Sequence, residues 1–316
     1  MTPLVSIVIP TYNRKLMAER LIKSILSGTY KNVEIIVIDD ASKDKTNEYL
    51  LKHFKSKRNI HIFRNKKNLF AAGSRNEGFK KIHGEYTFFV DDDNVLDSHA
   101  IKELVDIFQK DDSVGEAGPV NYSMLNKRKV LWSCTKRNMF TTKTNQSRST
   151  SEFKNQDSWE TDDIPNAYMV RSKVIKQNKI SFNAQYGIMY EESDYAYRIR
   201  KAGYKIMVGK KAKIYHDIES LINNKKKDFM FHFMSDKRRP FVFARNRVLF
   251  HRLYSTKFQF FFILIFWVWF FTAYYVYKFM SYRDYGNFTM KEKLISGLSY
   301  LNGTFSGIFL ICLKGM

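Results

Sequence analysis

The feature that most constrains the fold is an alternation of short apolar runs with amphipathic stretches in the first hundred residues. In the amphipathic stretches apolar residues recur at helical spacing, as Leu21, Ile22 and Ile25 do before Gly28. Strands that alternate with helices form βαβ units, so we expect an α/β fold with a mostly parallel, doubly wound sheet. The expected strands are residues 5–10, 33–38, 59–63 and 88–90.

Three consecutive carboxylates, Asp91, Asp92 and Asp93, follow the apolar run at 88–90. Asp is a poor strand former and neighbouring carboxylates repel one another, so folding alone would not select this sequence. A divalent cation would relieve the repulsion, and ligands of open α/β sheets bind just beyond the carboxyl ends of strands. The alternative is a solvated acidic turn that caps the helix beginning near Ser98.

A second acidic stretch, Glu191, Glu192 and Asp194, lies at the start of a helix expected over residues 194–201. Acids at a helix N-terminus complement its dipole, but three acids exceed what capping needs. The functional interpretation is a general base held on a rigid element. His216 follows a short strand, where it could be structural or join a metal site.

The charge balance favours anionic partners. Lys and Arg total 53 against 31 Asp and Glu, a net charge of +22, which suits nucleic acid, a membrane surface or phosphorylated small molecules. Two cysteines are too few for a disulfide framework and fit a reducing compartment. Residues 1–10 lack the basic segment of a signal peptide, so we expect the start of the chain in the cytosol.

The C-terminal part of the chain predicts a membrane attachment. Residues 225–252 mix basic and aromatic side chains, which suits either an anionic leaflet or an RNA-binding surface. Residues 258–277 then carry no charge and as a helix would span roughly 30 Å, so they favour a membrane over nucleic acid. A buried core helix is the alternative. A second, weaker apolar segment covers residues 294–313, and the basic residues before Phe258 place that side in the cytoplasm.

We therefore expect three parts: an α/β domain over residues 1–220, a basic juxtamembrane segment over 221–257 and a membrane region over 258–316. The α/β domain has no Gly-rich phosphate loop after its first strand, which argues against a dinucleotide-binding Rossmann domain and a P-loop enzyme.

Five short motifs occur in order along the chain: VSIVIPTYNR (5–14), IDDAS (38–42), AGSRNEG (72–78), VDDDN (90–94) and YEESD (190–194). Together they resemble family 2 glycosyltransferases of the GT-A fold, a Rossmann-like fold of nucleotide-sugar transferases. The resemblance covers roughly residues 4–250 and is nearest to membrane-attached bacterial or archaeal enzymes of glycan assembly. Residues 245–247, Arg-Asn-Arg, also resemble those enzymes.

The resemblance implies an inverting transfer of a sugar from a UDP- or GDP-linked donor to a hydroxyl, of the hexosyltransferase type. The implied acceptor is a lipid-linked glycan or a surface polysaccharide, and the implied cofactor is Mg²⁺ or Mn²⁺. The work would take place at the cytoplasmic face of the membrane, with no nucleic acid as partner.

The resemblance also assigns the donor-binding residues. Thr11 and Tyr12 would lie at the nucleobase, and Asp40 would bind the base or ribose with Asp39 behind it. Arg75 and Asn76 would lie near the ribose or diphosphate. The rest of the predicted substrate-binding set is Pro10, Asn13, Asp91, Asp92 and Asn166.

For the reacting groups, the resemblance assigns Asp91 and Asp93 to an Asp-x-Asp metal motif, with His216 as a further metal or diphosphate contact. The base of the family precedes a helical Arg by six residues, which gives Glu192 before Arg198. Many members carry Asp at that position, so Glu is a departure from the common pattern. Asp194 is the alternative base, and Glu191 completes the predicted catalytic group.

Two other functions remain open on the sequence. A polyprenyl-phosphate sugar synthase would use an acceptor that is already ionised, so the acidic cluster at 191–194 favours a hydroxyl acceptor. An inactive, membrane-bound binding module would have no need of intact acidic motifs. A nucleotidyltransferase would require a Gly-rich, Lys-containing N-terminal loop, which this sequence lacks.

Overall fold

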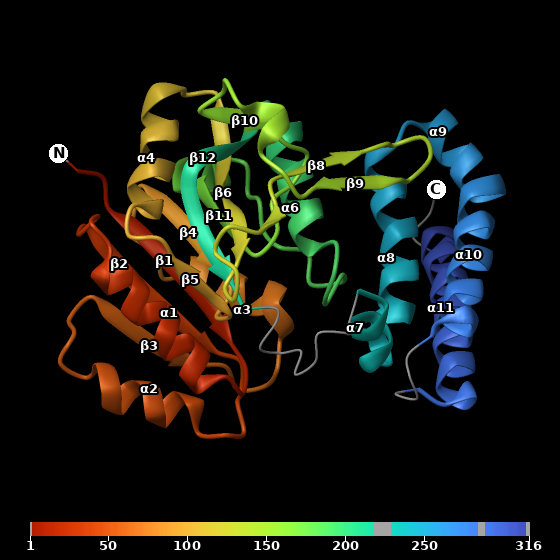
Figure 1. Cartoon of the computed structure of the whole chain (residues 1–316), viewed down its shortest axis with the longest axis horizontal. Coiled ribbons are helices and arrows are strands. Elements are labelled where there is room, and N and C mark those ends of the chain that lie inside the picture. Colours follow the sequence, from red (N-terminus) through yellow and green to blue (C-terminus); the bar gives the residue numbers. More distant parts are fainter. Residues whose placement is uncertain (1, 218–228, 284–287, 314–316) are drawn as a thin grey trace. The chain divides into compact units, whose positions relative to one another are not determined.

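The computed structural model of the chain describes residues 2–217, 229–283 and 288–313 (Figure 1). The chain divides into two compact units. The first runs from the N-terminus through the last strand, apart from segments 137–144 and 188–190, which group with the C-terminal helices in the second unit. The predicted basic cluster at 225–227 lies outside the described residues.

The first four strands of unit 1 form the expected parallel array. Each pairs in parallel with its neighbour, in the order β4-β1-β2-β3, and helices connect them (Figure 1). The predicted alternation of strand and helix is therefore confirmed. The elements are β1 (Val5–Thr11), α1 (Lys15–Ser27), β2 (Val33–Asp39), α2 (Thr46–Phe54), β3 (Ile60–Arg64), α3 (Phe70–Phe79) and β4 (Tyr86–Val90).

The second half of the sheet is mixed. Strand β11 (Ala167–Arg171) lies antiparallel between β4 and β6 (Val114–Ser123), and β12 (Lys205–His216) pairs in parallel with β6. The apolar residues at 206–208 and 212–215 predict two short strands, 205–208 and 212–215, but the structure has β12 alone, so that prediction is wrong. A register shift between Gly209 and Lys213 lets one strand follow β6 on both sides of the irregularity.

The remaining elements of unit 1 are short. Residues 135–158 are rich in Ser, Thr, Asn and Lys, which predicts an exposed loop or two thin strands. The structure has a two-stranded pair there, β8 (Cys134–Arg137) with β9 (Thr144–Ser147), whose tip belongs to unit 2. The others are β5 (Asn94–Leu96), α4 (Ala100–Lys110), β7 (Val130–Trp132), a 3₁₀ turn (Ser151–Phe153), β10 (Ser158–Glu160), α5 (Ser172–Gln177) and α6 (Glu191–Lys201).

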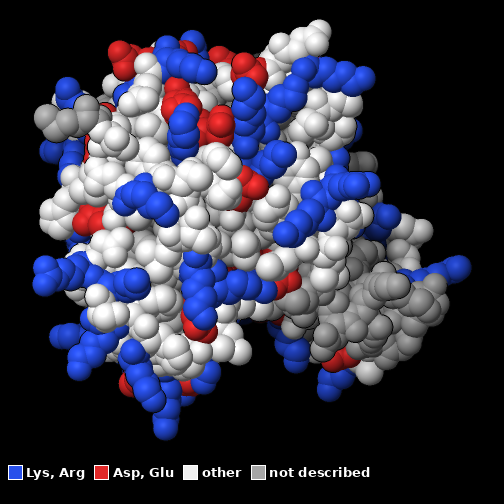
Figure 2. All heavy atoms as spheres, turned by 60° about the vertical axis from the view of Figure 1, so that its left-hand side comes forward, with Lys and Arg blue, Asp and Glu red and all other residues white. Residues whose placement is uncertain are grey.

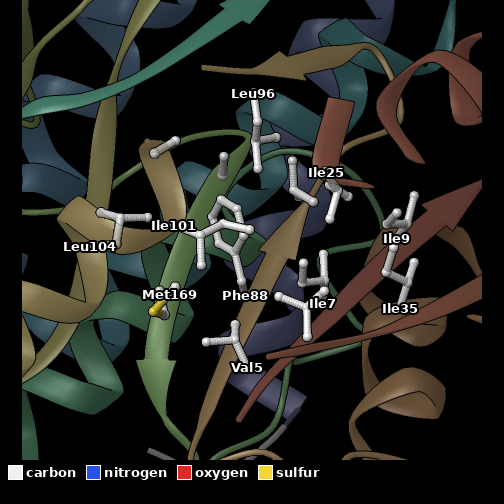
Figure 3. Close-up of a cluster of buried hydrophobic side chains, with 14 of the residues drawn as sticks. Val5, Ile7, Ile9, Ile25, Ile35, Phe88, Leu96, Ile101, Leu104 and Met169 are labelled. Atoms are coloured by element: carbon white, nitrogen blue, oxygen red, sulfur yellow. The ribbon is translucent and has the colours of Figure 1, made fainter. Parts of the chain in front are cut away.

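Two apolar clusters, one on each face of the sheet, fix this arrangement. Strands β1 and β2 are buried along their whole length because helices cover both faces. Alternate residues of one strand point to opposite faces, so Ile7 joins the cluster with α1, α2 and α4, and Val8 joins the cluster with α3, α5 and α6. Figure 3 shows the first cluster, whose labelled residues include Val5, Ile7 and Phe88 of the strands and Ile101 and Leu104 of α4.

Apart from segments 137–144 and 188–190, unit 2 is mostly helical among the residues described. Two of its helical stretches, Lys257–Ser281 and Met290–Cys312, are long and apolar enough to cross a membrane. The first contains the predicted segment 258–277, and the second covers the predicted segment 294–313 apart from its last residue. Large apolar side chains along both are exposed, such as Phe266 and Phe309 at 58% and 61%. The elements are α7 (Phe229–Ser235), α8 (Arg238–Tyr254), α9 (Lys257–Phe262), a π-helical stretch (Ile263–Trp267), α10 (Val268–Ser281) and α11 (Met290–Leu313).

The surface reflects the excess of basic residues. Lys and Arg side chains cover much of the face in Figure 2, and Asp and Glu form smaller groups between them. The positive charge is thus spread over this face. Such a surface attracts anions in general, in line with the net charge of +22.

Candidate functional site

A pocket opens in unit 1 beyond the carboxyl ends of β1, β2 and β4. Six of the predicted substrate-binding residues line this pocket. The other five do not contribute to its lining: Asn13, Asp39, Arg75, Asn76 and Asn166. The position is the one that open α/β sheets use for ligands, because strand ends and helix starts gather there. Its lining residues are Pro10, Thr11, Tyr12, Arg14, Asp40, Phe70, Ala71, Ser74, Asp91 and Asp92.

The ends of β1 and β2 build one wall of this pocket. The Asp40 amide donates to the Thr11 carbonyl at 2.9 Å, and the Asp40 carboxylate accepts from the Leu69 amide and from Asn65 Nδ2, both at 2.8 Å. Asp39 is fully buried and accepts from the Ser42 amide at 3.1 Å, and its burial raises its pKa. Asp40 therefore faces the pocket while Asp39 supports the turn behind it.

The turn after β1 presents one exposed ring. Asn13 has a left-handed backbone (φ 55°), and its carboxamide oxygen accepts from the Lys43 amide at 2.7 Å. The Asn13 amide in turn donates to the Ser42 hydroxyl at 2.8 Å. Tyr12 is 40% exposed at the pocket. The neighbouring turn therefore fixes Asn13, and Tyr12 is left available to stack on a planar group.

The three consecutive carboxylates each have a different partner. Asp91 Oδ1 lies 2.6 Å from Arg75 Nη2, and Asp92 accepts from the Thr11 hydroxyl at 2.7 Å. Asp93 lies 3.5 Å from His216 Nε2. Burial raises the pKa of Asp92 to about 7. Burial also opposes ionisation of Asp93, but the hydrogen bond and charge of His216 outweigh it and lower the pKa of Asp93.

Arg14 is a site residue that the sequence interpretation did not single out. Its Nη1 lies 3.0 Å from Asp92 Oδ1 and 3.1 Å from Asp93 Oδ2, and its side chain lines the pocket. The guanidinium therefore compensates two adjacent carboxylates from outside the Asp stretch. A sequence signal existed, because Arg14 is the last residue of the VSIVIPTYNR motif.

Asp93 and His216 provide one carboxylate and one imidazole side by side. Among the residues that the structure describes, no group of three or more His, Cys, Asp or Glu side chains is arranged to hold a metal ion. Mg²⁺ commonly takes only one or two protein carboxylates and completes its shell with phosphates and water, and carboxylate ligands also suit Mn²⁺. Asp93 and His216 thus fit a cation that a diphosphate brings, although they are too few to hold one alone.

A buried guanidinium joins the two acidic stretches. Arg75 on α3 is 1% exposed, and its Nη2 lies 2.6 Å from Asp91 Oδ1 and 2.9 Å from Glu192 Oε1. Its Nη1 lies 3.6 Å from Glu191 Oε1, and its guanidinium stacks near the ring of Phe182. Asn76 exchanges two hydrogen bonds with the backbone of Phe182, which fixes that ring. Arg75 therefore contacts carboxylates of both stretches.

Glu192 lies at this junction and has an unusual proton affinity. Its Oε1 accepts from Arg75 and from the Asn166 amide at 3.1 Å, and Asn166 Nδ2 lies 3.4 Å from His216 Nδ1. Burial, opposed by the charge of Arg75, raises the pKa of Glu192 to about 8. Such a pKa near neutrality suits a general base. Asp194 is fully buried and bound to Arg198 Nε at 2.7 Å, away from these groups.

Comparison with known proteins identifies the family. The sequence profile described as "Glycosyl transferase family 2" matches residues 6–178, more than half of the chain. The chain belongs to this family. Residues 6–178 include β1 apart from Val5, the strands β2 to β4, the residues that line the pocket and the Asp91–Asp93 stretch.

One curated relative acts on a lipid-linked glycan by its name. The chain is 36% identical over 104 residues to a GalNAc(5)-diNAcBac-PP-undecaprenol beta-1,3-glucosyltransferase of Campylobacter jejuni. The alignment covers 33% of this chain and 34% of that relative. The matched part of the chain thus spans about a third of the length of that curated relative.

Two solved structures with bound nucleotide or nucleotide sugar share the fold. S. aureus TarS 1–349 in complex with UDP-GlcNAc superposes with a TM-score of 0.55 over 96% of this chain and 73% of that one, at 17% identity. GalNAc-T7 with UDP, GalNAc and Mn²⁺ superposes with a TM-score of 0.63 over 99% of this chain and 57% of that one, at 14% identity. The predicted GT-A fold, with its mostly parallel sheet, is confirmed.

Proposed function

We propose that this chain is an inverting glycosyltransferase that moves a sugar from a nucleoside-diphosphate sugar to a hydroxyl of a lipid-linked glycan or surface polysaccharide. The observation that carries the proposal is the junction at Arg75. One guanidinium contacts Asp91, which lines the pocket, and Glu192, whose pKa of about 8 suits a general base. Arg75 thus contacts both a residue of the proposed donor site and the proposed base. This arrangement suits a reaction in which a sugar passes from a donor to an acceptor.

The donor would lie in the pocket with its base near Tyr12 and its ribose near Asp40. Tyr12 offers an exposed ring for stacking, and the Asp40 carboxylate is fixed by the Leu69 amide and Asn65. Mg²⁺ or Mn²⁺, held through Asp93 and His216, would neutralise charge on the departing diphosphate. The family match over residues 6–178 and the UDP-sugar complex of TarS support this placement.

The acceptor hydroxyl would lose its proton to Glu192. Its Oε1 is anchored by Arg75 and the Asn166 amide, and neither bond involves Oε2, so Oε2 would receive the proton. As the proton leaves, the acceptor oxygen bonds to the anomeric carbon, and the bond from that carbon to the diphosphate breaks on the opposite face. The configuration of the sugar carbon is therefore inverted. An already ionised phosphate acceptor would not need this base.

The membrane is the proposed place of the reaction. The two apolar helical stretches carry exposed side chains such as Phe266 and Phe309, whereas a buried core helix would cover them. The Campylobacter relative is named for a lipid-linked acceptor. We infer that unit 2 holds the enzyme at the cytoplasmic face, where nucleotide sugars are available and a lipid-linked acceptor can be delivered by the bilayer.

The test is transfer of label into lipid. Detergent-purified full-length protein is incubated with radiolabelled UDP- and GDP-sugars, Mn²⁺ and a membrane lipid extract, and the Glu192→Gln variant serves as the inactive control. We expect one sugar to enter the lipid fraction through an acetal bond to a hydroxyl. Label attached directly to polyprenyl phosphate would identify the phosphate acceptor instead. Donor binding without transfer from any sugar would favour the binding module.

A further inference from the structure

The turn that leads into α6 has an unfavourable backbone. Met189 and Tyr190 have φ angles of 66° and 72°, in the left-handed region that residues with a Cβ rarely adopt. Glycine at position 187 has φ 68°, where it is tolerated at no steric cost. Two successive strained residues persist only when the surroundings hold them in place.

Asn246 on α8 binds the backbone of this turn. Its Nδ2 donates to the Met189 carbonyl at 2.8 Å and to the Ile188 carbonyl at 3.1 Å. Its Oδ1 accepts from Arg245 Nε at 3.0 Å and Nη2 at 2.9 Å, so Arg245 fixes which end of the carboxamide faces the turn. Asn246 is fully buried, which strengthens these bonds by excluding water.

The same helix also holds the side chain of Tyr190. The Tyr190 ring packs against Phe243 and Phe250 of α8, with centroids 5.7 and 5.4 Å away. The guanidinium of Arg137, at the tip of the β8–β9 pair, lies 5.3 Å from the centre of that ring. Segment 188–190 accordingly groups with unit 2, whereas the next residue, Glu191, belongs to unit 1.

We propose that Asn246, on α8, is a positioning residue for Glu192. It acts on Glu192 through the turn at 188–190. The inference rests on the proposed role of Glu192 as base. Glu191 and Glu192 are the first two residues of α6, so the backbone of Tyr190 sets where that helix begins. Without the two bonds from Asn246, Met189 and Tyr190 relax toward ordinary backbone angles, and Glu192 loses its alignment with the acceptor. Asn246 itself touches no substrate.

The experiment compares Asn246→Ala with Asn246→Ser, whose hydroxyl can supply one of the two bonds. We expect turnover to fall about 100-fold in Asn246→Ala, the loss that a misplacement on the order of 1 Å can cause, with the donor KM unchanged. Amide hydrogen exchange over residues 188–193 should accelerate while exchange in β1 and β4 stays the same. The serine variant should fall between alanine and wild type.

A second substitution separates positioning from general damage. Met189→Gly removes the strain at that position, so the double variant Met189→Gly/Asn246→Ala should recover part of the lost turnover. Asn178→Ala is the matched control, because Asn178 also donates its amide to a carbonyl, that of Val174, but on α5. It should leave turnover and exchange at 188–193 unchanged.

The outcomes are distinct. Unchanged exchange at 188–193 in Asn246→Ala, or an unchanged turnover, would overturn the inference, and so would a failure of Met189→Gly to restore any activity. If Asn246→Ala does not fold, Asn246→Ser with the same exchange measurement decides. A Glu192→Gln variant with wild-type turnover would instead remove the proposed base, and the exchange data would still report whether Asn246 holds the turn.

Discussion

The two acidic stretches of this chain are alike in sequence and differ in environment. Asp91–Asp93 and Glu191–Asp194 each crowd three carboxylates into four residues or fewer, and each contacts arginines from elsewhere in the fold. Asp93, beside His216, has a lowered pKa, whereas buried Glu192 has a pKa of about 8. The comparison shows that a carboxylate can have either a lowered or a raised pKa, because its neighbours and its burial decide its proton affinity.

Arg75 is the point where the two stretches meet. It contacts Asp91 at 2.6 Å and Glu192 at 2.9 Å from a fully buried position. A shared guanidinium keeps the carboxylates close although they repel one another. This arrangement predicts that changes on one side of the site have different consequences from changes on the other.

The largest expected effect is on the base side. Glu192→Gln keeps the shape of the side chain but cannot accept the proton, so transfer should fall by about 10²- to 10⁴-fold. Donor affinity, measured by calorimetry, should stay the same. Glu77→Gln, which alters an exposed Glu paired with Lys80, is the control. A transfer rate near wild type for Glu192→Gln would show that another group is the base.

The corresponding change at Asp93, the proposed metal ligand, should affect binding of the nucleotide sugar. Asp93→Ala removes the carboxylate beside His216, so Mn²⁺ should no longer increase the affinity for a nucleotide sugar. Calorimetry with and without Mn²⁺ measures that increase. Asp157→Asn, at a carboxylate that is 80% exposed, is the matched control. Donor affinity that rises with Mn²⁺ in Asp93→Ala as it does in wild type would contradict the assignment.

The pH dependence of transfer should follow the ionisation of Glu192. Glu192 must be ionised to accept a proton, and its pKa is raised to about 8, so the active fraction grows as pH increases toward that value. We expect kcat/KM to rise about tenfold per pH unit below about pH 8 and to level off above it. A profile measured at saturating Mg²⁺ that is flat between about pH 6 and about pH 8 would contradict this proton affinity.

The smallest expected effect concerns Arg14, whose side chain lines the pocket and contacts Asp92 and Asp93. Arg14→Gln removes a charge beside Asp92 and Asp93, so Mn²⁺ should bind more tightly to the protein saturated with UDP, by about fivefold for a partly exposed ion pair. Electron paramagnetic resonance of free Mn²⁺ measures this affinity. Lys15→Gln is the control, because Lys15 Nζ lies 3.2 Å from the Asp44 carbonyl instead. If the Arg14→Gln and Lys15→Gln variants bind Mn²⁺ with equal affinity, Arg14 has no influence on cation binding.

Much of the pocket lining could be predicted from the sequence. The apolar runs at 33–38 and 88–90 end in Asp39–Asp40 and Asp91–Asp93, and parallel strands place such ends at one edge of the sheet. These are local patterns of strand and turn, which short-range propensity determines. Asp40, Asp91 and Asp92 indeed line the pocket, as do Thr11 and Tyr12.

Only the tertiary structure decided which charges meet. Arg75 and Glu192 are 117 residues apart in the sequence, and no periodicity links them. The antiparallel placement of β11 brings Asn166 to Glu192 and His216, and the order of strands in the sheet, not any motif, determines it. The hold of Asn246 on the 188–190 turn is likewise a long-range contact. Sequence thus determined the elements and the chemistry at their ends, whereas packing determined the partners and so the proton affinities, because these depend on burial and on charges that only folding brings together.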